Sequence, residues 1–241
     1  MELQLGGVEA LREGFEAMRT VARRHGFPGL HIMVNIACYE NDQTLHCWWP
    51  NLVERIKQAG GDSVYGYNVA RTHGYAALTD DRPLVPYADV LQSHEELFRL
   101  CEDRGLPFHP VATVGFDNTP RWHRGAALPI DFRKHHYEPI VVGNTPERFG
   151  EAVRSGLDSI RRCGGGKRML LLNAWNEWTE GCQLLLDQWH GTGYMEALAV
   201  ELGNFKGKTH ENSANHSRSH SCGNPVGVWA HADGWGRGGH G

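Results

Sequence analysis

Strand-length apolar runs alternate with helix-length amphipathic segments along most of this chain. The clearest apolar runs are residues 30–36, 63–69, 108–114 and 169–172. Apolar residues at helical spacing lie before, between and after them, in segments 8–22, 52–59, 97–101, 149–160 and 194–202. Because strand–helix–strand units make parallel strands with helical crossovers, this alternation predicts an α/β fold. The last run lacks polar alternation, which is typical of a strand buried on both faces.

Local start signals place two of the helices more closely. Ser93 and Glu96 have capping-box spacing, which predicts a helix that begins at Ser93. Thr145 is a suitable N-cap residue, and Pro146 suits the first helical position. Residues 137–142 are a candidate for a short additional strand.

Polar residues follow the predicted strands at the ends where a (β/α) barrel carries its chemistry. Tyr67 and Asn68 end the second run, Asp117 follows the third, and Glu177 and Glu180 follow the fourth. We therefore predict a (β/α) TIM-barrel type of fold. Since a closed barrel needs eight strands and only four are clear, we expect an N-terminally truncated barrel, about its C-terminal half. A half-barrel completed by a partner chain is the alternative.

The residues after the last apolar run read N-A-W-N-E-W-T-E-G, so several side chains suited to catalysis or binding lie in one turn. Glu177 and Glu180 are three residues apart, next to Trp175, Asn176 and Trp178. Paired carboxylates beside aromatic rings suit acid/base work on a sugar, where one carboxyl holds a proton and the other stays ionised. The indole rings can stack on a sugar ring, and the amide can bind its hydroxyls. The alternative is a packed tryptophan pair with two solvated carboxylates.

Three blocks in this order resemble the C-terminal part of a known family. They are residues 115–121, 143–149 and 173–181, the last followed by related residues at 184–187 and 191–197. Together they resemble the glycoside hydrolase family 99-like proteins, which include the WbsX-type glycosyltransferases. The first block has Phe116 where that family has Trp.

The resemblance implies retaining cleavage of α-mannosidic bonds by two glutamates. Glu177 matches the residue that assists the substrate's own 2-hydroxyl, and Glu180 matches the residue that acts as acid and then as base. A WbsX-type glycosyltransferase of bacterial polysaccharide assembly is the first alternative. A non-catalytic carbohydrate-binding protein is the second.

Three other residues are candidates for substrate binding. Asp117 either contacts a substrate hydroxyl, or orients the nearby arginine, or forms an Asx-turn with the residues that follow it. Tyr67 and Asn68 either contact substrate or close the core at the end of their strand.

Charge and cysteine pattern limit the partners of the chain. The net charge of −4 argues against nucleic acid, and no apolar run is long enough to cross a bilayer. The six cysteines lack metal-ligand spacing, so we expect no metal site. We also expect no other cofactor. The expected partner is a glycan or oligosaccharide substrate, with the oligomeric state left open. The first residues do not resemble a signal peptide, which predicts a cytoplasmic protein if Met1 is the native start.

A change in composition near residue 206 predicts a domain boundary. Residues 1–206 carry the periodic pattern of the partial barrel. Residues 207–241 are rich in His, Gly and Ser without apolar periodicity, and we expect them to form a disordered tail.

Overall fold

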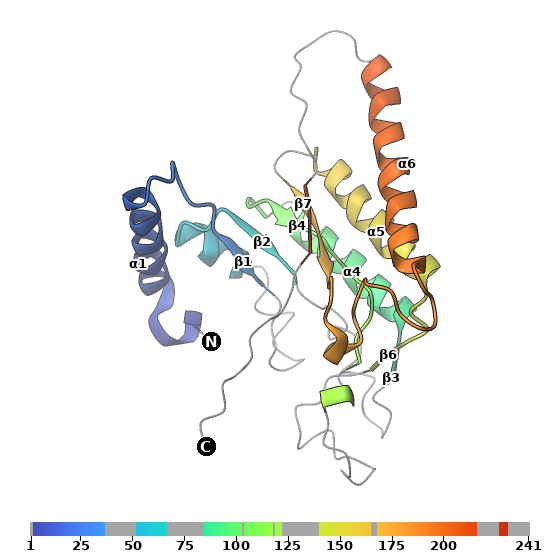
Figure 1. Ribbon diagram of the computed structural model, residues 1–241. Coiled ribbons are helices and arrows are strands. Elements are labelled where there is room, and N and C mark those ends of the chain that lie inside the picture. Colours follow the sequence, from blue (N-terminus) through green and yellow to red (C-terminus); the bar gives the residue numbers. More distant parts are fainter. Residues whose placement is uncertain are drawn as a thin grey trace.

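The computed structural model describes residues 2–36, 52–66, 84–102, 104–117, 119–121, 140–164, 168–215 and 227–230. Helix α1 (Glu2–Arg24) lies beside strands β1 (Met33–Asn35) and β2 (Ser63–Tyr65), away from the other long helices (Figure 1). Residues 52–58 are also helical. Within the described residues, no helix combines the length and apolar character that a membrane crossing requires.

Parallel strands make up the sheets of the described chain. One sheet has the order β1-β2-β4, where β4 is Phe108–His109. A second has the order β5-β7-β8, with bounds Val111–Thr113, Met169–Asn173 and Gly227–Ala230. A third pairs β3 (Leu84–Pro86) with β6 (Ile140–Val142). These parallel strands confirm the predicted α/β class, and the described residues do not form a closed barrel.

Pro110 separates β4 from β5 within one extended segment, because proline has no N–H to donate to a ladder. The segment bonds to β2 through β4 and to β7 through β5, and thus joins two of the sheets. In the β5–β7 pair, Thr113 is the register partner of Asn173. Since both strands run the same way, the residues after Thr113 and after Asn173 lie at the same sheet edge.

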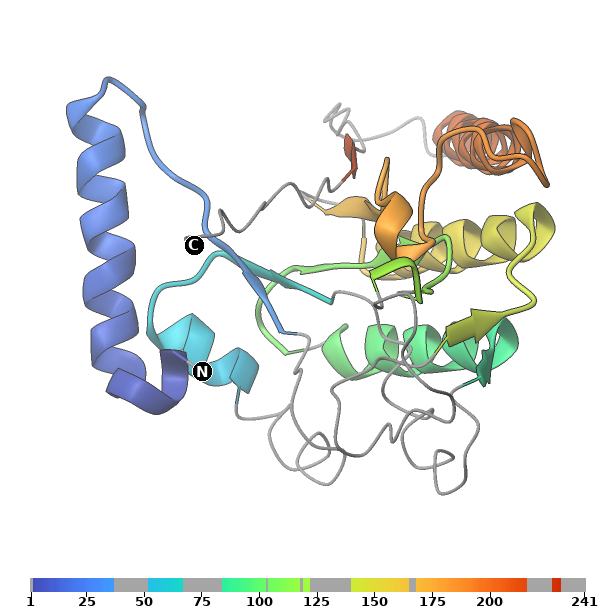
Figure 2. The same cartoon turned by 60° about the horizontal axis from the view of Figure 1, so that its bottom comes forward.

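The largest apolar core lies between β5, β7 and the helices beside them. Helices α4 (Tyr87–Cys101), α5 (Pro146–Arg162) and α6 (Gly193–Asn215) lie side by side (Figure 2), and α5 packs on both strands. The predicted apolar stripe of α5 is buried there: Phe149, Val153, Leu157 and Ile160. The resulting core holds the β5–β7 edge in place.

The start of α5 confirms the predicted capping. Thr145 is the N-cap, and its hydroxyl oxygen accepts a hydrogen bond from the Arg148 N–H at 3.4 Å. Pro146 takes the first helical position. Strand β6 also confirms an extended segment within residues 137–142.

The predicted start of α4 at Ser93 is wrong. The helix begins at Tyr87, and the Ser93 hydroxyl donates to the carbonyl of Asp89 inside it, at 2.8 Å. Burial explains the earlier start, since Tyr87 and Val90 pack in the main core and the Tyr87 hydroxyl donates to the Thr113 carbonyl at 2.5 Å. These distant contacts stabilise a first turn that the local pattern does not indicate.

The expected boundary at residue 206 differs from the observed elements. Helix α6 continues to Asn215, and strand β8 pairs with β7 inside the segment that we expected to be disordered. Propagating an existing helix costs far less than nucleating a new one, so a polar continuation of α6 needs no apolar stripe of its own. The division into residues 1–206 and 207–241 stays a prediction.

Candidate active site

The residues after β7 form a tight turn closed by backbone hydrogen bonds. The Ala174 N–H donates to the Cys182 carbonyl at 2.8 Å, and the Leu184 N–H donates to the Ala174 carbonyl at 2.9 Å. The Asn173–Ala174 peptide bond is cis. The Cys182 N–H donates across the turn to the Glu177 carbonyl at 3.3 Å. Residues 174–184 are therefore held as one compact loop at the edge of the sheet.

Both predicted carboxylates lie in this turn, and both are buried. Glu177 is 7% exposed and Glu180, at the end of the 3-10 turn η2 (Trp178–Glu180), is 9% exposed. The Thr179 hydroxyl donates to Glu177 Oε1 at 2.5 Å and orients that carboxylate. The alternative interpretation, in which both carboxylates are solvated, is therefore wrong.

The two tryptophans beside the glutamates are partly exposed, unlike core residues. Trp175 is 43% exposed and Trp178 is 49% exposed, so part of each indole faces solvent. Asn176 is exposed between them, and its backbone carbonyl accepts from the Trp178 N–H at 3.0 Å. The turn thus places accessible indoles and an amide next to buried carboxylates.

Asp117 joins this turn from the end of the neighbouring strand. Its N–H donates to the Glu180 carbonyl at 2.6 Å. Its Oδ1 accepts from the Thr119 N–H at 2.9 Å, which confirms the Asx-turn alternative. Gly181, at φ 58°, packs against it, and a Cβ there would lie 3.0 Å from the Asp117 Cβ. The close approach of the two strand ends therefore requires glycine at 181.

Tyr67 and Asn68 lie outside the described residues, so their proposed substrate contacts stay predictions. Among the residues that are described, no group of three His, Cys, Asp or Glu side chains could hold a metal ion.

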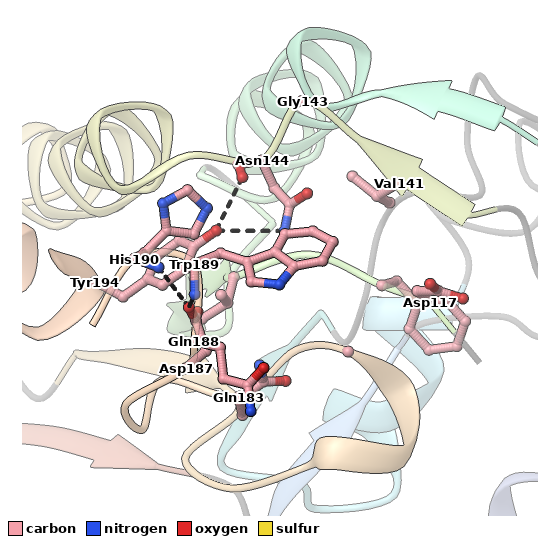
Figure 3. Close-up of a pocket in the computed structure, with 13 residues that line it drawn as sticks. Asp117, Val141, Gly143, Asn144, Gln183, Asp187, Gln188, Trp189, His190 and Tyr194 are labelled. Carbon is pink, nitrogen blue, oxygen red and sulfur yellow. Dashed lines mark hydrogen bonds between the residues drawn. The ribbon is translucent and has the colours of Figure 1, made fainter. Parts of the chain in front are cut away.

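A cavity of about 570 Å³ opens beside the turn and was not predicted (Figure 3). Of the predicted site residues only Asp117 lines it; Glu177 and Glu180 do not. Its polar and aromatic lining residues are Phe116, Asp117, Asn144, Gln183, Asp187, Gln188, Trp189, His190 and Tyr194. We refer to it as the Trp189 pocket. The loop of residues 174–184, which carries the buried Glu177 and Glu180, is called the glutamate turn below, and the pocket lies beside it.

Hydrogen bonds between the end of β6 and the start of α6 build one wall of the Trp189 pocket. The Tyr194 hydroxyl donates to the Asn144 carbonyl at 2.9 Å and accepts from the Asn144 side-chain amide at 3.4 Å. Burial raises the pKa of Tyr194 to about 12, with the nearby Asp187 carboxylate adding to the rise. The His190 ring packs edge-on against the Tyr194 ring, with centroids 5.3 Å apart. This phenol therefore stays neutral over the physiological pH range.

A short turn carries the most accessible aromatic of the pocket. Asp187 Oδ1 accepts from the N–H groups of Trp189 at 2.7 Å and His190 at 2.6 Å. The Gly191 N–H donates back to the Asp187 carbonyl at 3.1 Å. On this fixed turn Trp189 is 86% exposed, and its indole lies across the pocket in Figure 3.

The comparison with protein families agrees with the sequence blocks. A family model described as Glycosyltransferase WbsX matches residues 6–198. The chain belongs to the WbsX glycosyltransferase family. Searches of curated proteins and of solved structures gave no match. Membership of the WbsX family indicates a carbohydrate-active enzyme, in agreement with the WbsX part of the resemblance.

The matched span of this WbsX-family chain includes every lining residue of the Trp189 pocket. Asn144 and Tyr194 already lie in the blocks that carry the resemblance, which was a usable signal for them. Trp189 and Gln183 lie between those blocks and carry no signal of their own. An exposed tryptophan in a loop can be recognised as a candidate binding residue only when the segments around it in the structure are known.

Proposed function

We propose that this WbsX-family chain is a glycoside hydrolase that cleaves glycosidic bonds with Glu177 and Glu180. The observation that carries the proposal is the pair of buried glutamates in one turn that also carries two half-exposed indoles. Glycosidic cleavage needs a general acid and a second carboxylate beside the scissile bond, and this turn carries two carboxyl groups three residues apart. The indole faces supply a stacking surface for the sugar ring.

The proposed mechanism assigns one proton transfer to each glutamate. Glu177 accepts the proton of the substrate's 2-hydroxyl as that oxygen bonds to the anomeric carbon, while Glu180 protonates the departing glycosidic oxygen. Glu180 then takes a proton from water, and the resulting nucleophile attacks the anomeric carbon. Glu177 returns its proton to the 2-oxygen, so the configuration is retained. The Thr179 hydroxyl supports this role by fixing the Glu177 carboxylate.

The parallel strands support a relationship to the glycoside hydrolase family 99-like proteins. We propose that they belong to a (β/α) TIM-barrel type of domain, whose catalytic residues lie at the carboxyl ends of the strands. The glutamate turn follows β7, and Asp117 follows β5 at the same edge. An α-mannosidic bond is the substrate that the resemblance favours.

Glycosyl transfer from an activated donor is the second candidate, and the family description favours it. A nucleotide-sugar donor carries a diphosphate, which proteins usually bind with Arg, Lys, a metal or a glycine-rich loop. Among the described residues, the lining of the Trp189 pocket carries two carboxylates and neither Arg nor Lys. This part of the site therefore favours the hydrolase over the nucleotide-dependent transferase.

Product analysis separates the candidates. The protein is incubated with α-mannosides and other oligosaccharides, and separately with nucleotide sugars and acceptor glycans. We expect release of reducing sugar from an oligosaccharide and a loss on the order of a hundredfold or more in Glu177→Gln and Glu180→Gln. Glu151→Gln, on the exposed face of α5, is the matched control. Nucleotide release would favour the transferase, and sugar binding without turnover would favour the non-catalytic alternative.

A further inference from the structure

We propose that the Trp189 pocket is a second carbohydrate subsite, which binds a neutral pyranose unit next to the one at the glutamate turn. The placement of this unit next to a sugar at the glutamate turn rests on the proposed function, whereas the binding of sugar in the pocket does not. A volume of about 570 Å³ lies within the range of roughly 300–1,000 Å³ that is usual for small-molecule sites.

The pocket begins where the glutamate turn ends. Gly181, which follows Glu180 directly, lines the pocket. Gln183, two residues further along the same loop, lines it as well. Asp117 lines it from the other side and donates its N–H to the Glu180 carbonyl at 2.6 Å. A glycan bound at the glutamates can therefore extend over Gly181 into the pocket without crossing another element that the structure describes.

An unsatisfied amide indicates that the pocket accepts a polar ligand. The Gln183 Oε1 atom is buried and has no hydrogen-bond partner among the described residues. Buried polar atoms nearly always have a partner, and Gln183 lines the cavity, so a rotation of its side chain that brings Oε1 to the cavity would let a ligand hydroxyl or water satisfy it. A side-chain amide beside a cavity suits a sugar hydroxyl, which both donates and accepts. The neutral Tyr194 phenol and the Asn144 amide lie on the opposite wall.

The exposed indole indicates that the ligand also has an apolar face. Trp189 is 86% exposed, although burying an indole in the core would be favourable, and its backbone is fixed by Asp187. An indole face beside amide groups fits the C–H face of a pyranose ring whose hydroxyls reach those amides.

Charge restricts the ligand to a neutral one. The lining carries the carboxylates Asp117 and Asp187, with His190 as the one titratable nitrogen among the described lining residues. Two unit negative charges repel a phosphate or a sugar acid at short range. The pocket therefore favours a neutral hexose over a phosphorylated or nucleotide-linked one.

Titration followed by NMR of the tryptophan indoles tests the proposal in the full chain. The eight tryptophans give separate indole N–H signals, and the Trp189 signal is the one missing from Trp189→Ala. Methyl α-pyranosides of mannose, glucose and galactose are the probes, with inorganic pyrophosphate as the charged comparison. We expect at least one pyranoside to shift the Trp189 signal and pyrophosphate to leave it in place.

Two variants sharpen the test. Gln183→Leu should weaken the titration about tenfold, the scale of one hydrogen bond. Leu186→Ala, in the same loop but outside the pocket, should leave it unchanged. A Trp189 signal that stays still while other indoles shift, or that responds to pyrophosphate more tightly than to any pyranoside, would overturn the proposal.

The outcome separates the subsite from the proposed catalysis. A Trp189 shift that survives in the Glu177→Gln, Glu180→Gln double variant supports the subsite whether or not turnover is observed. Turnover that depends on the glutamates, together with an unresponsive Trp189, would leave the hydrolase proposal standing and refute the subsite.

Discussion

Replacing His94 should change how the stability of the protein depends on pH. His94 lies on α4 and is only 2% exposed. Its Nε2 has no hydrogen-bond partner among the described residues, and its ring packs against Phe98 with centroids 5.9 Å apart. Burial lowers the pKa of His94 from 6.5 to about 4, with a hydrogen bond to the Val111 backbone opposing the change. The folded protein therefore holds this imidazole neutral.

The sign of the effect follows from where the proton binds. The unfolded chain takes up a proton on His94 near pH 6.5, whereas the folded chain resists protonation until about pH 4. The stability from this group is fully present above pH 6.5 and is lost as pH falls toward 4. A pKa difference of this size corresponds to about 3 kcal/mol of unfolding free energy, at roughly 1.4 kcal/mol for each unit.

Urea denaturation at pH values across this interval measures the effect. In His94→Leu the free energy of unfolding should fall less steeply with decreasing pH than in the unsubstituted protein, by about 3 kcal/mol over the whole interval. His25→Leu is the matched control, because His25 is exposed, and it should keep the original slope. Equal slopes for the His94→Leu variant and the unsubstituted protein would refute the assignment of a neutral, buried imidazole.

Three further substitutions test contacts around the site by chemical denaturation. Phe149→Ala should lose about 3–5 kcal/mol, because Phe149 is fully buried in the main core. Arg154→Met should lose about 1–2 kcal/mol: it leaves buried Glu201 without its partner at 2.6 Å, but solvent screens the half-exposed arginine. Gly181→Ala should lose about 1–2 kcal/mol and lower activity, because its positive φ and the nearby Asp117 disfavour a Cβ. An unchanged midpoint in any variant would contradict the contact concerned.

Elements whose determinants lie close together in the chain were predictable. The start of α5 depends on Thr145 and Pro146 alone, and β7 depends on one uninterrupted apolar run. The start of α4 was not predictable, because Tyr87 gains its stability from Thr113 on a distant strand. Strand β3 was missed for a similar reason: its residues are few, and their partner is β6, which lies far along the chain.

The residues of the site likewise fall into a group that was predictable from the sequence and a group that was not. Glu177, Glu180 and the tryptophans beside them are nearly contiguous, so residue types and spacing were enough to propose them. The Trp189 pocket is assembled from the ends of β5 and β6 and from the loop after the glutamate turn. The Val141 N–H, which donates to the Phe116 carbonyl at 2.7 Å, is one of the contacts that bring those segments together. Without strand pairings, nothing in the sequence places Asn144 and Gln183 in the same pocket.

The distinct roles of Glu177 and Glu180 are tested most directly by the dependence of rate on the leaving group. The measurement is kcat/KM for each glutamine variant, with an activated glycosyl fluoride and an ordinary disaccharide linkage as substrates. Fluoride departs without protonation, so Glu180→Gln should recover much of its activity on the fluoride while losing on the order of a hundredfold or more on the disaccharide. Glu177→Gln should stay impaired on both, because the 2-hydroxyl still needs its base. Full activity of either variant on the disaccharide would contradict the paired-carboxylate mechanism.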